Sequence, residues 1–190
     1  MNIVYGGAFN PPSLAHIEIV NKLLEKYPKS NVILLPVGND YNKQELIDFK
    51  DRYKMLKLCF KDNKRVIISK LENEIKFNGT INSLNILSNS YNNIHLVTGS
   101  DNIVEFKTWI RYEDLLRTYP LIIIDRDKID VNSEMEKFKY LNVQYERIYF
   151  DSKINSTMIR KDLNTFKEWL NIDVYNYILK NKLYGVDNNV

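Results

Sequence analysis

Short apolar segments alternate along the chain with segments in which apolar residues recur every three or four positions. The apolar segments are β-branched and nearly continuous, which is typical of strands covered on both faces of a sheet. The helical spacing of the other segments predicts helices between these strands. We expect strands at Ile3–Tyr5, Val32–Leu35, Arg65–Ser69, Ile94–Thr98, Leu121–Ile124 and Tyr145–Phe150. We expect helices at Ser13–Tyr27, Phe49–Phe60, Thr80–Asn89, Arg111–Thr118, Ser133–Lys139, Ser156–Asn164 and Ile172–Asn181.

This alternation predicts an α/β fold with a doubly wound parallel sheet. No repeat or linker divides the chain, so we expect one domain over residues 1–190, with 156–185 as a C-terminal helical portion packed on it. Such sheets bind ligands beyond the carboxyl ends of their strands, where the strand order reverses. The loops that follow Tyr5, Leu35, Ser69, Thr98 and Phe150 are therefore the places to look for a site.

Composition narrows the class of protein without naming a function. The 190 residues include 27 Lys and Arg against 24 Asp and Glu, and the net charge of +3 gives no electrostatic reason to expect a nucleic acid partner. A single cysteine excludes a disulfide framework and a Cys-rich zinc site, and fits a cytoplasmic location. No leader and no apolar run of about 18 residues is visible, so no membrane partner is expected.

The turn after the first strand combines several features of a phosphate site. Gly6 and Gly7 allow close approach of backbone to a ligand and permit a positive φ. A helix is expected to begin near Ser13, which shares one face of the first turn with His16. The N-terminus of a helix attracts anions through free N–H groups and the helix dipole. The alternative is a plain tight turn with a capping or packed histidine, but the coincidence of these features favours function.

A second candidate phosphate segment lies near the other end of the chain. Ser156 is a candidate N-cap, Thr157 adds a hydroxyl, and Arg160 lies one turn further on. Taken alone, this segment is better explained as an ordinary cap followed by a surface arginine.

Three residues in the middle of the chain carry both a binding and a structural interpretation. Lys43 is a cation in a ligand-side loop, or one solvated lysine among many. Asp101 follows a strand end, where a carboxylate can accept from ribose hydroxyls or cap the next helix. Trp109 can stack on a flat heterocycle, although core packing is the usual fate of tryptophan. His95 lies inside an apolar run and is expected to be a core or edge residue.

Two motifs in this chain resemble those of the nucleotidyltransferases related to class I aminoacyl-tRNA synthetases. Residues 7–16 resemble the signature Gly-x-Phe-(Asp/Asn)-Pro-x-(His/Thr)-x-(Gly/Ala)-His, with Ser13 in place of His or Thr and Ala15 where Gly is most common. Residues 154–160 resemble the motif Ile-Ser-x-Thr-x-(Ile/Val)-Arg, which clamps the triphosphate of ATP. The two motifs stand in the family's order, which is far more specific than either alone.

The middle of the chain is similar to the nicotinate/nicotinamide mononucleotide adenylyltransferases of that superfamily. It has the Arg-x-x-Met-Leu helix at 52–56, the Thr-x-(Asp/Asn)-(Thr/Ser)-Leu start at 80–84 and a Gly-(Ala/Ser)-Asp block at 99–101 followed by Trp-x-Arg. The resemblance runs from Met1 to about Gly185. One departure is Asn78-Gly79-Thr80, where the family commonly has Ser-Tyr-Thr, so the aromatic wall from that tyrosine is missing.

The resemblance implies a Rossmann-like nucleotidyltransferase that transfers an adenylyl group from ATP to nicotinate mononucleotide, giving deamido-NAD and pyrophosphate in NAD biosynthesis. Mg²⁺ is expected on the ATP phosphates, with no protein metal ligand. The implied catalytic residues are His16, Lys43 and Arg160. The implied ATP contacts are Gly6, Gly7, Ala8, Phe9, Ser13, His16, Gly99, Asp101, Ser156, Thr157 and Arg160. The implied contacts to the pyridine mononucleotide are Asn10, Lys43, Thr80 and Trp109.

Other functions stay open on the sequence. The acceptor could be nicotinamide mononucleotide or phosphopantetheine, or the enzyme could be a cytidylyltransferase. A non-catalytic nucleotide sensor on the same fold is a different class, favoured by the departures at Ser13, Ala15 and Gly79. Retention of His16, Lys43 and Arg160 argues against a sensor, since a pure binder does not need all three around one triphosphate. The oligomeric state is not readable.

Overall fold

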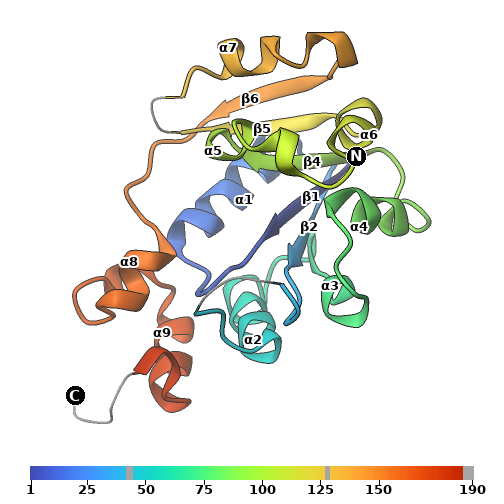
Figure 1. Cartoon of the computed structure of the whole chain (residues 1–190). Helices are drawn as coiled ribbons and strands as arrows, with labels where there is room; N and C mark the ends of the chain where they lie inside the picture. The colour runs from blue at the N-terminus through green and yellow to red at the C-terminus, as the bar shows by residue number, and fades with distance from the viewer. Residues whose placement is uncertain (42–44, 127–128, 186–190) are drawn as a thin grey trace.

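A six-stranded parallel sheet with helices on both faces forms the centre of the protein (Figure 1). The computed structural model describes residues 1–41, 45–126 and 129–185. Its strands are β1 Asn2–Gly7, β2 Asn31–Pro36, β3 Val66–Ile68, β4 Ile94–Gly99, β5 Leu121–Asp125 and β6 Tyr145–Tyr149. Their order is β3-β2-β1-β4-β5-β6, and every neighbouring pair is parallel. This confirms the predicted doubly wound sheet and places the reversal of strand order between β1 and β4.

The helices agree with the predicted periodicity, apart from short segments. The α-helices are α1 Leu14–Lys26, α2 Phe49–Cys59, α3 Leu71–Glu74, α4 Thr80–Leu87, α5 Ser100–Ile103, α6 Tyr112–Thr118, α7 Val131–Glu136, α8 Ser156–Lys161 and α9 Ile172–Lys180. Four 3₁₀ turns cover Phe106–Thr108, Lys139–Leu141, Lys167–Trp169 and Leu183–Gly185. α3 and α5 were not predicted because four residues are too few to show a helical period. α7 begins earlier than expected because Asp130 accepts hydrogen bonds from the N–H groups of Asn132 and Ser133.

Alternate residues of the central strands enter two separate cores, one on each face of the sheet. Ile3, Val32 and Leu34 pack with side chains of α1 and α2. Val4, Ile33 and Leu35 point the other way and pack with side chains of α4, α6 and α7. This period of two follows from the pleat of a strand, and burial on both faces explains why these strands read as continuous apolar runs.

The prediction that every strand is covered on both faces is wrong for β6. Four of its five residues are exposed, and Tyr149 keeps 72% of its surface accessible. β6 pairs only with β5, so it is an edge strand of the sheet. Its polar residues Glu146 and Arg147 fit this position, because a charged edge resists pairing with another chain.

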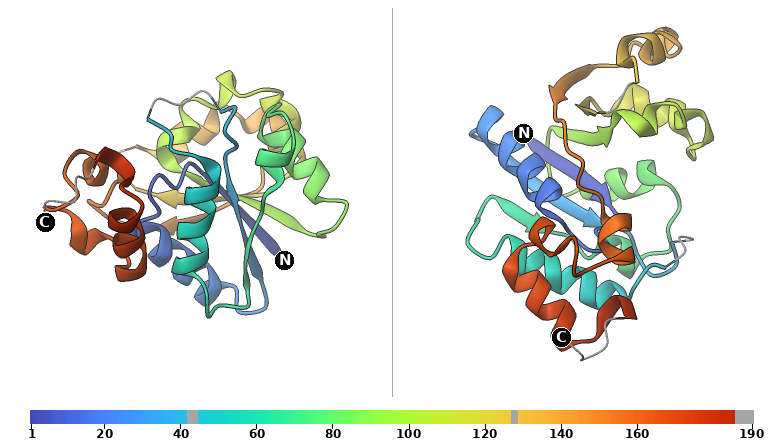
Figure 2. Two further views of the ribbon diagram at one scale, coloured as in Figure 1. Left: turned by 90° about the horizontal axis from the view of Figure 1, so that it is seen from below. Right: turned by 90° about the vertical axis from the view of Figure 1, so that its left-hand side faces the viewer.

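The C-terminal helices pack beside α2, as the two views of Figure 2 show. Buried side chains of α8 and α9 form a third apolar cluster with Met55 of α2. Two tyrosine hydroxyls bond the C-terminal portion to the rest of the protein. Tyr177 donates to Asp51 at 2.8 Å, and Tyr184 donates to Asn10 Oδ1 at 2.9 Å. The last contact joins the C-terminal portion to the turn after β1. No helix within the described ranges is long and apolar enough to cross a bilayer.

Replacing Gly38 with alanine should destabilise the protein by roughly 1–3 kcal/mol, the usual cost of forcing a methyl group into a packed site. A Cβ at Gly38 would lie 2.0 Å from the backbone oxygen of Glu72, and backbone cannot move aside as a flexible side chain can. Urea denaturation measures the loss. Gly6→Ala is the matched control, since its nearest neighbour would be the Leu35 oxygen at 3.9 Å. Equal stability of the two variants would contradict the close packing of α3 on Gly38.

Candidate active site

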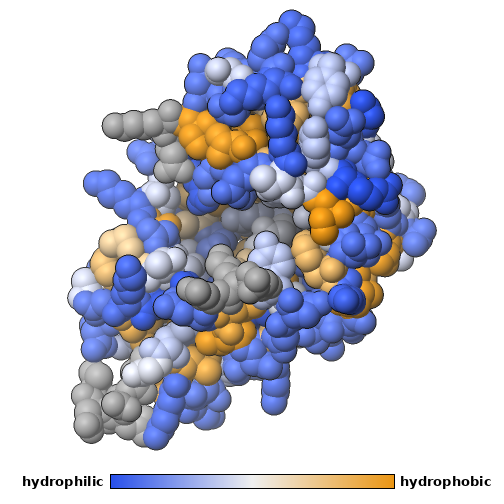
Figure 3. Space-filling model, viewed as in Figure 1, coloured by the Kyte–Doolittle hydropathy of each residue, from blue (hydrophilic) through white to orange (hydrophobic). Residues whose placement is uncertain are grey.

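A cavity of about 650 Å³ lies at the carboxyl ends of the central strands. Its walls include Gly6 and Gly7 of β1, Leu35 of β2 and Gly99 of β4, so it lies where the strand order reverses, as expected. The surface of the protein is visibly hollowed at this place (Figure 3). The volume suits a small-molecule ligand.

The turn after β1 is built differently from the prediction. Gly6 and Gly7 are extended strand residues, and the positive φ of 47° belongs instead to Phe9. The Phe9 ring is buried against His16, with ring centroids 5.1 Å apart. Gly7 leaves room for that ring, because a Cβ there would lie 3.3 Å from it. Gly6, Gly7 and Ala8 line the cavity, whereas Phe9 lies behind them and supports His16.

The imidazole of His16 lines the cavity at the first turn of α1, and its hydrogen bonds define its tautomer. Nδ1 accepts the backbone N–H of Ser13 at 3.0 Å and lies 2.9 Å from the Ser13 hydroxyl oxygen. A backbone N–H can only donate, so the proton of the neutral ring is on Nε2. Burial, with a smaller contribution from the positive charge of Arg126, lowers the pKa of His16 to about 4. At neutral pH His16 is therefore an uncharged donor with a fixed orientation.

Ser13 and Asn10 do not line the cavity. Ser13 is fully buried and holds the His16 ring from behind. Asn10 is 2% exposed, and its amide donates to the Glu45 carbonyl at 2.8 Å while its oxygen accepts from Tyr184. Both side chains hold neighbouring parts of the turn in place here. Their expected contacts to phosphate and to the acceptor stay predictions.

The second phosphate segment packs directly against the first. Asn155 and not Ser156 is the N-cap of α8, because its side chain accepts the Met158 N–H at 2.8 Å; the predicted cap was wrong by one residue. Ser156 is thereby free to donate its hydroxyl to the Pro11 carbonyl at 2.8 Å. Thr157 is exposed in the first turn of the same helix.

Arg160 joins the two segments through its guanidinium. Nη1 donates to the Asn10 carbonyl at 2.8 Å, and Nη2 lies 3.1 Å from a carboxylate oxygen of Glu45. The guanidinium is thus held beside the turn after β1 and engages an anion there, although it does not line the cavity. Lys43, the other predicted cation, lies outside the described residues.

Asp101 and Arg126 form one wall of the cavity. Their contact is bidentate, with Nη2 to Oδ2 at 2.8 Å and Nε to Oδ1 at 3.2 Å. Asp101 lies in the first turn of α5 and is not its N-cap, which is Gly99, so the capping alternative is wrong. A Cβ at Gly99 would lie 2.2 Å from the Asp101 carboxylate, so a side chain there would force this pair to shift.

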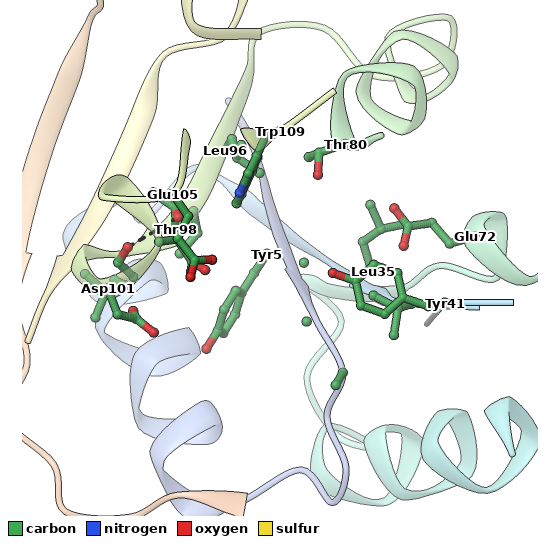
Figure 4. Close-up of a pocket in the computed structure, with 18 of the residues that line it drawn as sticks. Tyr5, Leu35, Tyr41, Glu72, Thr80, Leu96, Thr98, Asp101, Glu105 and Trp109 are labelled. Atoms are coloured by element: carbon green, nitrogen blue, oxygen red, sulfur yellow. Dashed lines mark hydrogen bonds between the residues drawn. The ribbon is translucent and has the colours of Figure 1, made fainter. Parts of the chain in front are cut away.

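Thr80 and Trp109 lie at another part of the cavity, and Figure 4 shows both on one side of it, away from Asp101. Trp109 packs edge-on against Phe106, with ring centroids 5.2 Å apart, and it also lines the cavity. Its stacking on a heterocycle stays a prediction. Gly79 has a φ of 83°, and a Cβ there would lie 2.8 Å from Ile110. A tyrosine at this position is therefore excluded by backbone and packing together. The Tyr41 and Phe77 rings, 5.1 Å apart, supply aromatic surface to the cavity in its place.

Several residues that line the cavity, among them Tyr5, Glu72 and Arg126, were given no role from the sequence. Arg126 follows β5 directly, and the loop after that strand was not among those selected. Tyr5 was predicted only as a strand residue. In the structure, burial raises the pKa of its hydroxyl to about 12. Glu72 belongs to α3, a helix too short to be predicted.

Comparison with known proteins agrees with this geometry. A cytidylyltransferase-like family model matches residues 4–162. A protein of Acholeplasma laidlawii named probable nicotinate-nucleotide adenylyltransferase is 39% identical over 185 residues, which cover 97% of each chain. The chain belongs to the nicotinate-nucleotide adenylyltransferase family.

Other members of the family extend the agreement. A relative of the same name from Fusobacterium nucleatum is 33% identical over 83% of this chain and 84% of its own length. Among solved structures, nicotinic acid mononucleotide adenylyltransferase of Plasmodium falciparum complexed with NaAD matches with a TM-score of 0.81 and 25% identity over 99% of each chain. The Rossmann-like nucleotidyltransferase fold implied by the motifs is thus confirmed over the whole length.

Proposed function

We propose that this chain transfers the adenylyl group of ATP to nicotinate mononucleotide, giving deamido-NAD and pyrophosphate. Family membership, and the packing of the second phosphate motif against the turn that borders the cavity, support this function. The main observation in its favour is the neutral His16 in the first turn of α1. Ser13 fixes the orientation of its ring, with the proton on Nε2.

The reaction needs alignment and charge stabilisation more than acid–base chemistry. The phosphate of the acceptor, ionised at neutral pH, attacks the α-phosphorus of ATP, and the bond from that phosphorus to the bridging oxygen breaks as pyrophosphate leaves. No base is required, because the nucleophile carries its charge already. His16 Nε2–H donates to the phosphate oxygens as negative charge builds during departure. Ser13 acts through His16 as a positioning residue.

The triphosphate is proposed to lie between the turn after β1 and the start of α8. Backbone at Gly6, Gly7 and Ala8 borders the cavity there. Arg160 stands beside this turn and would exchange the Glu45 carboxylate oxygen for phosphate oxygens, which accept from a guanidinium in the same way. Ser156, Thr157 and Lys43 are proposed to complete the cradle, as the family motif implies.

The two nucleotides are proposed to occupy opposite sides of β1. Asp101 and Gly99, at the end of β4, are assigned to the adenosine ribose. Arg126 holds the Asp101 carboxylate in place, and the carboxylate oxygens can still accept hydrogen bonds from ribose hydroxyls. Thr80 and Trp109 are assigned to the pyridine mononucleotide, with Asn10 positioning the turn between them.

Mg²⁺ is proposed to arrive on the phosphates of ATP. In the described part of the chain no group of three or more His, Cys, Asp or Glu side chains is placed to hold a metal ion. The cytoplasmic location expected from the sequence stays a prediction.

Isotope transfer tests the reaction type. With ATP labelled at the α-phosphate, the label should enter a dinucleotide when nicotinate mononucleotide is present, whereas a γ-label should leave in pyrophosphate. Release of orthophosphate, or ATP binding without any transfer, would contradict adenylyl transfer; the second result would favour the sensor.

A further inference from the structure

A buried carboxyl group lines the cavity and has no part in the mechanism above. Glu72 is 3% exposed, yet it belongs to the cavity wall. Burying a carboxyl group is costly unless a partner compensates it, and a cavity is one of the few places where such a group serves a purpose. Among the described residues, Glu72 is the only cavity-lining carboxyl group that is at least nine-tenths buried. It is therefore a candidate for ligand recognition.

Glu72 is held rigidly from two directions. The Ser83 hydroxyl of α4, itself fully buried, donates to Oε1 of Glu72 at 2.7 Å. The Glu72 backbone packs on Gly38, where no Cβ would fit. With Ser83 donating to Oε1, Oε2 is the oxygen that can carry the proton of the neutral acid toward a ligand. Such a fixed group can distinguish ligands that differ by one donor or acceptor.

The position of Glu72 assigns it to the acceptor end of the cavity. Figure 4 shows its carboxyl group directed from α3 into the space between Thr80 and Tyr41, with Asp101 on the far side of Tyr5. Glu72 follows β3 and Asp101 follows β4, and these strands lie on opposite sides of β1. If adenosine takes the Asp101 side, the pyridine mononucleotide takes the side of Glu72.

The charge of Glu72 changes near neutral pH. Burial raises its pKa to about 7, the hydrogen bond from Ser83 acts to lower it, and the Asp40 carboxylate raises it. Asp40 faces it from the loop after β2 and accepts the Phe77 N–H at 3.0 Å. On its own helix, Lys70 at the N-cap extends over the Tyr53 ring instead.

We propose that Glu72 reads the substituent on the pyridine ring of the acceptor, a role that rests on the proposed function. Protonated, Glu72 donates from Oε2 to the carboxylate of nicotinate mononucleotide. Ionised, it repels that carboxylate and accepts from the amide of nicotinamide mononucleotide. Preference for the nicotinate form therefore falls as pH rises through the pKa, and preference for the amide form grows.

The ratio of kcat/KM for the two acceptors, measured between pH 6 and 8.5, tests this proposal. Titration of the acceptor phosphate, of ATP and of His16 affects both acceptors and cancels in the ratio. Because nicotinate is bound by protonated Glu72 and nicotinamide by ionised Glu72, the nicotinate-to-nicotinamide ratio should follow the ratio of these two forms and fall by roughly tenfold per pH unit across this range. In Glu72→Gln, which keeps an acceptor for Ser83 and carries no charge, the ratio should not change with pH.

Glu105→Gln is the matched control, since Glu105 is an exposed acid on the same cavity, and it should keep the wild-type pH dependence. A wild-type ratio that does not change with pH would overturn the proposal even if Glu72→Gln fails to fold. So would a pH dependence that persists in Glu72→Gln. If neither acceptor gives a dinucleotide, the proposed function itself is overturned.

Discussion

Replacing His16 with alanine should lower kcat for dinucleotide formation by about 10²-fold or more, comparable with the loss of one oxyanion donor in other enzymes. The ring offers a single proton on Nε2, and Ser13 prevents it from turning away. Alanine removes the donor but leaves the start of α1 able to form, because alanine is a strong helix former. Stopped-time assays of pyrophosphate release measure kcat, and thermal denaturation checks that the fold is intact.

His95→Ala is the control for this variant. His95 is half-buried on β4, its Nδ1 lies 3.4 Å from the Asn93 carbonyl, and it does not line the cavity. Its loss should leave kcat within about twofold of wild type, as expected of a surface substitution away from the site. Near-normal turnover in His16→Ala with an intact fold would remove His16 from the chemistry.

Arg160→Ala should reduce kcat/KM for ATP by about 10- to 100-fold, which corresponds to the loss of a charged hydrogen bond of about 1.5–3 kcal/mol. The guanidinium already holds an anionic partner, Glu45, beside the turn after β1. Replacing that carboxylate with a triphosphate adds charge at the same guanidinium. The effect should be larger on kcat/KM for ATP than on KM for the acceptor, since Arg160 is assigned to the triphosphate.

Lys161→Ala is the matched control for charge and position. Lys161 is the next residue on α8 and is exposed, so its removal should change kcat/KM for ATP by less than about twofold. If both variants lose ATP affinity equally, the loss reflects net positive charge and not the proposed clamp. If Arg160→Ala binds and uses ATP normally, the second motif has no part in the triphosphate site.

The fold was readable from the sequence because its central strands are covered on both faces. Val32 to Leu35 are all buried, which gives an uninterrupted apolar run between two helical segments. The edge strand β6 was located correctly, but its exposure was not foreseen, because Tyr and Ile favour strands whether or not both faces are covered.

The candidate site was predictable where motif and strand end coincide. Gly7, His16, Gly99, Thr80 and Trp109 all line the cavity as expected. Ser13 and Asn10 do not, because a motif conveys which residue types occur together and not which of them face the ligand and which hold the others in place.

The roles of Glu72 and Arg126 could not be predicted from the sequence, although Glu72 lies in the loop after Ser69 that was expected to border the site. Glu72 enters the cavity only because a four-residue helix packs against Gly38, a contact between distant segments. The role of Arg126 becomes visible only through its contact with Asp101, which lies 25 residues earlier in the chain. The glycine at position 79 likewise makes sense only once Ile110 is seen beside it.

The most direct measurement is the steady-state kcat/KM of the full chain with ATP and each of three acceptors at pH 7: nicotinate mononucleotide, nicotinamide mononucleotide and phosphopantetheine. Each turnover should release one pyrophosphate and form one dinucleotide with nicotinate mononucleotide, with no detectable product from phosphopantetheine. We expect the highest kcat/KM for nicotinate mononucleotide. Faster transfer to phosphopantetheine, or no pyrophosphate from any acceptor despite ATP binding, would contradict it.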